Sequence, residues 1–195
     1  MTDNTDDIAK YLYEMGQLKR VKRSGWWIAG VRDPESVAEH AFRTAIIGYV
    51  LAQLEGADAE KTALMCLIHD NHEARLNDQH RIGRRYMPAG DANERAFTEQ
   101  AARLPTEAAS GLVALLKSFE AGDSREALLA RDADQLECLL QAREYQALGH
   151  KDVDDWIQGS RAALRSASAQ AIGDACIAME PSAWWAGLKA DKPPT

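Results

Sequence analysis

Apolar side chains recur at three- and four-residue steps along most of the chain, which is the spacing that an amphipathic helix needs to bury one face. No run of β-branched residues alternates with polar ones, so the pattern predicts no strand. We therefore expect an all-α fold, a helical bundle of about six to eight helices. The predicted helices include segments at about 5–18, 34–55, 92–103, 106–119, 124–148 and 152–170.

A further helix begins at Asp58 or Ala59 and contains the run ALMCLIH. Because this run is apolar on nearly all sides, it indicates a helix in the middle of the protein. Two segments interrupt the helical pattern. Residues 19–34 are basic, then aromatic, then turn-like, which predicts a loop or short irregular element; residues 75–91 are polar and rich in Arg and Gly, which predicts a loop with one helical turn.

The chain length bounds the domain organisation. A chain of 195 residues can bury one good core and is too short for two ordinary ones, so we predict a single domain over residues 1–195. Its core lies at about residues 5–170. Residues 171–195 mix apolar and breaker residues, which indicates a short helix followed by a tail.

Charge and composition narrow the range of partners. The formal net charge of -7 argues against a surface built mainly for nucleic acid. The N-terminal segment is acidic and amphipathic, unlike a signal peptide, and no stretch approaches the ~20 apolar residues of a membrane span. The three cysteines are far apart in the sequence, which indicates buried free thiols in a reducing compartment. We expect a cytoplasmic protein with neither a membrane nor a nucleic acid as its partner.

Two costly polar groups, His69 and Asp70, end the nearly apolar run. Buried imidazole and carboxylate need a compensating partner, and a divalent cation can be that partner; a helix end that emerges into solvent is the alternative. Glu73 lies four residues after His69 and three after Asp70, so on a helix its carboxylate shares their side and is placed to act as a general acid or base. His40 faces the same way as apolar neighbours, and such a histidine by itself is more often a core group than a ligand.

A fourth ligand has to come from another helix. The segment RDADQLECLLQA offers Asp132 and Asp134. The helical angle mildly favours Asp134 as the inward-facing carboxylate, but periodicity leaves both open.

Three motifs resemble a known family. GWWIAGVRDPESVAEHAFR, LIHDNHEA and DADQLECLLQAREY occur in this order between about Leu18 and Asp155. Together they resemble the HD-domain superfamily of metal-dependent phosphohydrolases and, within it, the small 5'-deoxynucleotidase group. The combination is far more specific than the dipeptide His-Asp alone.

The resemblance implies roles for particular residues. It implies that one divalent metal ion is held by His40, His69, Asp70 and Asp134. Two imidazoles and two carboxylates suit Mn, Co, Fe, Ni or Zn, with Mg less expected. It also implies that Glu73 is the catalytic carboxylate, and that Asp78 is a second carboxylate near the sugar and the attacking water. Trp26 would pack beside the nucleotide, and a homodimer is implied as well.

The sequence departs from the group at two positions. In members of the group an arginine directly precedes the tryptophan, but this chain has Gly25 at that position. Recognition of the phosphate and sugar must therefore use another cation. Arg23 is our candidate, with Arg20, Lys19 and the pair Arg84-Arg85 as further possibilities. Asn77 stands where members often have glycine.

The expected activity is metal-assisted hydrolysis of (deoxy)nucleoside 5'-monophosphates to nucleoside and phosphate. An HD-type nucleoside triphosphohydrolase or a cyclic-nucleotide phosphodiesterase would use the same ligands on another phosphate bond. A non-catalytic nucleotide-binding HD protein is the alternative from another class, although Glu73 and Asp78 argue against it.

Overall fold

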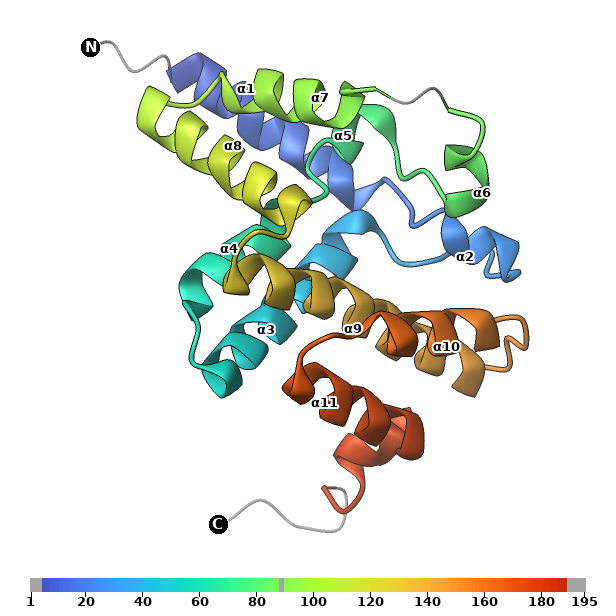
Figure 1. Cartoon of the computed structure of the whole chain (residues 1–195). Helices are drawn as coiled ribbons and strands as arrows, with labels where there is room; N and C mark the ends of the chain where they lie inside the picture. The colour runs from blue at the N-terminus through green and yellow to red at the C-terminus, as the bar shows by residue number, and fades with distance from the viewer. Residues whose placement is uncertain (1–4, 88–89, 189–195) are drawn as a thin grey trace, which may run out of the picture.

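The computed structural model describes residues 5–87 and 90–188, which are mostly helical (Figure 1). No strand forms among these residues, apart from an isolated bridge between Lys22 and Ser36. The predicted all-α class is therefore confirmed. The elements are α1 (Thr5–Met15), η1 (Gly16–Lys19), α2 (Gly25–Ile28), α3 (Val37–Glu55), α4 (Ala59–Ile68), α5 (Glu73–Leu76), α6 (Arg81–Arg84), α7 (Ala92–Ala101), α8 (Thr106–Ala121), α9 (Arg125–Ala147), α10 (Asp154–Ala163), α11 (Ala167–Ala178) and η2 (Pro181–Trp185).

Helix α9 runs through the centre of the molecule and packs against α3, α4 and α10 (Figure 1). Several side chains at this contact are alanines, and short side chains let neighbouring helices approach one another closely. Among the described residues, no helix is both long and apolar enough to cross a membrane. The main core cluster includes Leu51, Met65, Cys66, Ala130, Ala133 and Leu136.

The α3–α4 pair is a short helical hairpin whose ends are set by local signals. Ser36 forms a capping box with Glu39 at the start of α3, and Gly56 ends the helix in the left-handed conformation with φ 66°. Asp58 then caps α4, since its carboxylate accepts a hydrogen bond from the Lys61 amide. Because so short a connection makes the two helices antiparallel, the first turn of α3 lies beside the last turn of α4.

Gly48 permits the close contact between these two helices. A Cβ atom added at Gly48 would lie 2.5 Å from Cys66 Sγ and 3.4 Å from Cγ2 of Thr62. Both neighbours are fully buried, so they have little room to move away. The hairpin geometry thus depends on the missing side chain at this position.

One predicted helix is wrong. Residues 152–170 form two helices, α10 and α11, with a break at residues 164–166. Asp132 causes this break, because its carboxylate accepts hydrogen bonds from the backbone amides of Arg165, at 2.9 Å, and Ser166, at 2.7 Å. A tertiary contact therefore overrides the local helical pattern.

The other predicted boundaries differ less from those in the structure. The predicted first helix ends at Met15 and continues as a 3₁₀ turn, η1. The segment 19–34 contains the short helix α2, and 75–91 contains the expected helical turn as α6. The C-terminal region is more helical than expected, since α11 reaches Ala178 and η2 follows; residues 189–195 of the predicted tail lie outside the described residues.

We predict that Gly48→Ala lowers the thermal unfolding midpoint, because overpacking a tight core costs about 1–3 kcal/mol and outweighs the gain of about 1 kcal/mol in helix propensity. Gly111→Ala is the matched control, because Gly111 lies within α8 and nothing comes within 4 Å of an added Cβ. This control should raise the midpoint. Equal shifts for the two variants, measured by circular dichroism, would contradict the role of Gly48.

Candidate metal centre and its pocket

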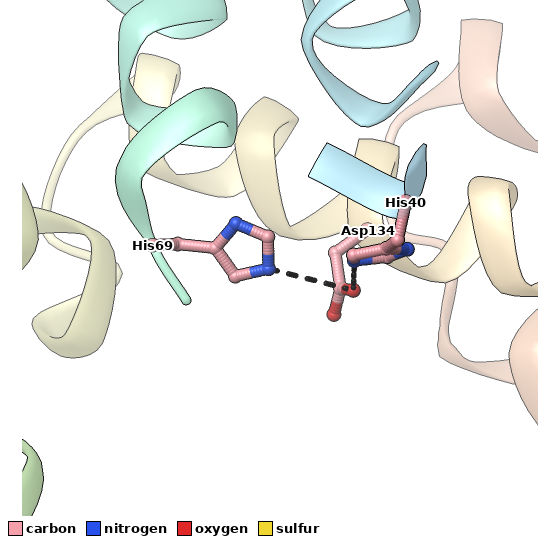
Figure 2. A group of neighbouring side chains, drawn as sticks. All are labelled: His40, His69 and Asp134. Carbon is pink, nitrogen blue, oxygen red and sulfur yellow. Dashed lines mark ion pairs between the residues drawn. The ribbon is translucent and has the colours of Figure 1, made fainter. Parts of the chain in front are cut away.

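Four side chains predicted as ligands converge at one end of the α3–α4 hairpin. His40 lies in the first turn of α3, His69 follows the end of α4, and Asp134 comes from α9 (Figure 2). Asp70 is the residue after His69. Asp134 Oδ1 lies 3.2 Å from His40 Nε2 and 3.8 Å from His69 Nε2. Asp70 Oδ2 lies 3.2 Å from His69 Nε2 and 3.9 Å from His40 Nε2. His40, His69 and Asp134 are therefore close enough to hold one metal ion, and a carboxylate oxygen of Asp70 lies within 4 Å of both imidazole nitrogens.

Hydrogen bonds to the other ring nitrogens set the tautomers of both histidines. His69 Nδ1 donates to the backbone carbonyl oxygen of Cys66 at 2.7 Å. His40 Nδ1 donates to Oε2 of Glu137 at 2.6 Å. Since a proton occupies each Nδ1, the lone pair of each neutral imidazole lies on Nε2 and faces the carboxylates, as metal ligation requires.

The pKa values of these four side chains are shifted by their closeness to one another. Burial by itself lowers the pKa of His40, but nearby carboxylates outweigh burial and raise it to about 9. Burial likewise opposes a charge on His69, yet Asp70 and Asp134 hold its pKa well above the ordinary value. Burial would raise the pKa of Asp70 and Asp134, and the two imidazoles lower it instead.

This donor set fits a divalent cation. With neutral imidazoles, the Nε2 lone pairs and the carboxylate oxygens would repel one another at 3.2–3.9 Å unless a positive charge lies between them. Protons or a metal ion can supply that charge. Two nitrogen and two oxygen donors are typical of borderline first-row metals.

A cavity of about 470 Å³ opens beside these ligands. This is within the usual size of small-molecule sites, roughly 300–1,000 Å³. His69, Asp70 and Asp134 line it, and so do Arg23 and Asp78. Further residues of its wall are Trp26, Arg81, Arg84, Gln135 and Trp156.

Glu73 lies in the short helix α5 and is 1% exposed. Its Oε2 is buried and has no hydrogen-bond partner among the described residues, and Arg84 lies 4.0 Å from Oε1. Burial, with the negative charges of Asp70 and Asp78, raises its pKa to about 8. Glu73 can therefore carry or release a proton near neutral pH.

Asp78 and Arg23 tie the pocket loops to the ligands. The Ser24 amide donates to Asp78 Oδ2 at 2.5 Å, and the Ser24 hydroxyl donates to the Asp78 carbonyl at 3.0 Å. Arg23 Nη1 donates to Asp70 Oδ2 at 3.2 Å. Asn77, just before Asp78, has φ 59° and ψ 161°, a conformation that glycine adopts most readily. This backbone explains the glycine expected there.

Trp26 lines the pocket, but its side chain is only 2% exposed. Its indole Nε1 donates to Glu35 at 3.0 Å, and its ring packs edge-on against Tyr145. The adjacent Trp27 is 54% exposed and is not among the lining residues. Of the two adjacent tryptophans, only Trp26 therefore belongs to the pocket.

Comparison with known proteins identifies the family. A family model described as the HD domain matches residues 15–171. The chain belongs to the HD-domain family.

Relatives of this HD domain include named enzymes. A human protein named as a 5'-deoxynucleotidase is 31% identical over 152 residues, covering 74% of this chain and 71% of the relative. One from Dictyostelium discoideum is 33% identical over 146 residues, covering 70% and 76%. A solved structure of a conserved hypothetical protein from Pyrococcus furiosus is 26% identical, with a TM-score of 0.73 over 88% of this chain and 99% of that one. The resemblance inferred from the motifs is confirmed.

The HD-domain structure separates the two aspartates that periodicity left open. Asp134 joins the two histidines, whereas Asp132 is 2% exposed and its carboxylate caps the start of α11. The two side chains lie on different sides of α9 and perform different tasks.

Sequence reasoning missed Glu137 and Arg43. Glu137 is fully buried, and its Oε1 accepts a hydrogen bond from Arg43 Nε at 2.9 Å while Oε2 binds His40. Both residues follow a ligand by three positions on the same helix, His40 on α3 and Asp134 on α9. That spacing is the signal that could have revealed them.

We predict that Glu137→Gln weakens metal binding by about 10- to 100-fold, because it loosens the hydrogen bond that orients His40. Competition against a metal-sensitive chelator, with Mn as the probe, measures the dissociation constant. Glu144→Gln is the control, since Glu144 binds the same Arg43 at 2.7 Å but is remote from His40 in the described hydrogen bonds. Equal dissociation constants for both variants would remove Glu137 from this role.

Proposed function

We propose that this chain is a metal-dependent phosphomonoesterase that hydrolyses (deoxy)nucleoside 5'-monophosphates to nucleoside and inorganic phosphate. The observation that carries the proposal is the cluster of His40, His69, Asp70 and Asp134, of which the last three line a nucleotide-sized cavity. Relatives named as 5'-deoxynucleotidases support the choice of substrate.

One divalent cation fits the two imidazoles and two carboxylates, with Mn, Co, Fe, Ni or Zn expected and Mg possible but less expected. When bound, it supplies Lewis-acid polarisation of the phosphoryl group and a lowered pKa of water. The four side chains hold and orient it. Arg43 and Glu137 keep His40 in the ligating tautomer.

The protein's own carboxylates handle the protons. Glu73, with its pKa raised to about 8, can give a proton to the leaving oxygen of the nucleoside or take one from the attacking water. Asp78 lines the cavity and is fixed by Ser24, so it can orient the sugar and the water.

We assign phosphate binding to Arg23, which replaces the arginine expected at Gly25. Its guanidinium contacts Asp70 and lines the cavity, so it lies where a phosphoryl oxygen beside the ligands can reach it. Arg81 and Arg84 line the same cavity and add positive charge. We place the activity in the cytoplasm, where nucleoside monophosphates and reduced thiols occur together.

Glu73→Gln should lower kcat by at least about 100-fold, because it removes the proton-transfer group. Phosphate release from a panel of 5'-monophosphates with added Mn or Co measures the activity, and metal analysis of the purified protein should show unchanged content. Glu99→Gln, at an exposed glutamate of α7, is the control.

The panel also separates the competing activities. Triphosphate or a linear dinucleotide among the products would replace the proposal by one of the two other hydrolases. No phosphate from any wild-type reaction would contradict the enzyme proposal.

We also propose a homodimer formed through the outer face of α3. Phe42, Ile46, Val50 and Leu54 recur every four residues and are 65%, 50%, 44% and 62% exposed. Such a continuous apolar stripe is unusual on a surface that faces only water. The opposite side of the same helix carries His40, so a second copy there would leave the centre uncovered.

Ile46→Glu should convert the dimer to a monomer, because it places a charge in the middle of the stripe. Light scattering after size-exclusion chromatography gives the mass. Leu12→Glu, at a 63% exposed leucine of α1, should leave the mass unchanged. A monomeric wild type, or an unaffected mass for Ile46→Glu, would sink the assignment.

A further inference from the structure

The proposed chemistry uses one side of the cavity and leaves the wall formed by α10 without a task. Four residues of this helix, Asp155, Trp156, Gly159 and Ser160, line the cavity together. Their spacing of one, four and five positions puts them on one face. Trp156 is the large aromatic group of this face, and it is only partly buried.

The indole of Trp156 packs against the indole of Trp26, which is itself held in place. Its centroid lies 5.7 Å from that of Trp26, with 32° between the ring planes. Trp26 is held in turn by Glu35 and Tyr145. Since Trp26 is only 2% exposed, it has almost no free face for a ligand, whereas Trp156 retains one side toward the cavity.

Gly25 lies beside Trp156 in the cavity wall. A Cβ atom added at Gly25 would lie 3.8 Å from the indole Nε1 of Trp156. This is an ordinary van der Waals distance, so Gly25 and the Trp156 indole are direct neighbours in the cavity wall.

The surroundings of Trp156 suit a flat heterocycle. Gly159 has no heavy atom within 4 Å of an added Cβ, so the space beside it is open. The carboxylate of Asp155 and the amide of Gln135 also line the cavity and can pair with ring nitrogens or amino groups. An aromatic face with a few polar groups is the usual way in which proteins bind a base without a strict sequence preference.

We infer that Trp156 is the stacking residue for the nucleobase of the substrate. This inference rests on the proposed function. His69, Asp70 and Asp134 line the same cavity, so a nucleotide there can place its phosphate at the ligands and its base on α10. Trp26 then acts as a positioning residue that supports Trp156.

The test compares a substrate with a base and one without. Deoxyadenosine 5'-monophosphate and deoxyribose 5-phosphate share the sugar and phosphate, and only the first can stack. Trp156→Ala should lower kcat/KM for the nucleotide by about 10-fold or more, mainly through KM, because stacking on an aromatic ring contributes strongly to base binding. The value for deoxyribose 5-phosphate should stay unchanged.

Two further variants complete the test. Trp156→Phe keeps a ring and should retain most of the preference for the nucleotide. Trp27→Ala is the matched control, because Trp27 is exposed and outside the set of lining residues. Inhibition by the nucleoside deoxyadenosine should weaken in Trp156→Ala, while inhibition by inorganic phosphate should not.

The outcomes distinguish this inference from the proposed function. Equal losses on both substrates would make Trp156 a structural support and overturn the inference. If the wild type hydrolyses the nucleotide and the Trp156→Ala variant does so with the same kcat/KM, the inference is overturned too. If the wild type releases no phosphate at all, the proposed function fails, and equilibrium dialysis of deoxyadenosine against both proteins still decides whether Trp156 binds the base.

Discussion

The close antiparallel contact between α3 and α4 is the constraint on which the rest of the site depends. It needs the missing side chain at Gly48, beside Cys66, and a connection short enough to bring the start of one helix to the end of the other. His40 and His69 then lie with ring centroids 5.5 Å apart. Because Asp134 comes from a third helix, the ligands meet only when all three helices are packed.

Concentrating charge at this point requires compensation from the surrounding side chains. A buried carboxylate or imidazolium is costly unless a partner of opposite charge lies beside it. Arg23 faces Asp70, and Glu137 stands between His40 and Arg43. The neighbours of the ligands are therefore part of the centre, and they restrict which tautomers and rotamers the histidines can adopt.

Ligand geometry and substrate recognition come largely from different parts of the fold. The packed helices position the ligands, whereas α2, α6, α10 and residues 78–80 form most of the cavity wall, to which α8 adds Phe119 and α9 adds Gln135 and Cys138. Asp78 and Ser24 join two of these segments through their hydrogen bonds. A change such as Gly25 can therefore alter the wall without disturbing the centre, which is how one helical scaffold accommodates different substrates.

The sequence by itself determined the helical class and most helix ends, because apolar periodicity and caps such as Ser36 and Asp58 act within a few residues. Its motifs also identified the HD family. The resemblance to that family already implied Asp134 rather than Asp132 as the ligand. Only the tertiary structure showed what Asp132 binds, disclosed Glu137, and interrupted the helix predicted at 152–170. Each of these depends on a partner from a distant segment: Asp132, for example, bonds amides 33 and 34 residues away. Local patterns carry no information about such partners, so packing had to supply it.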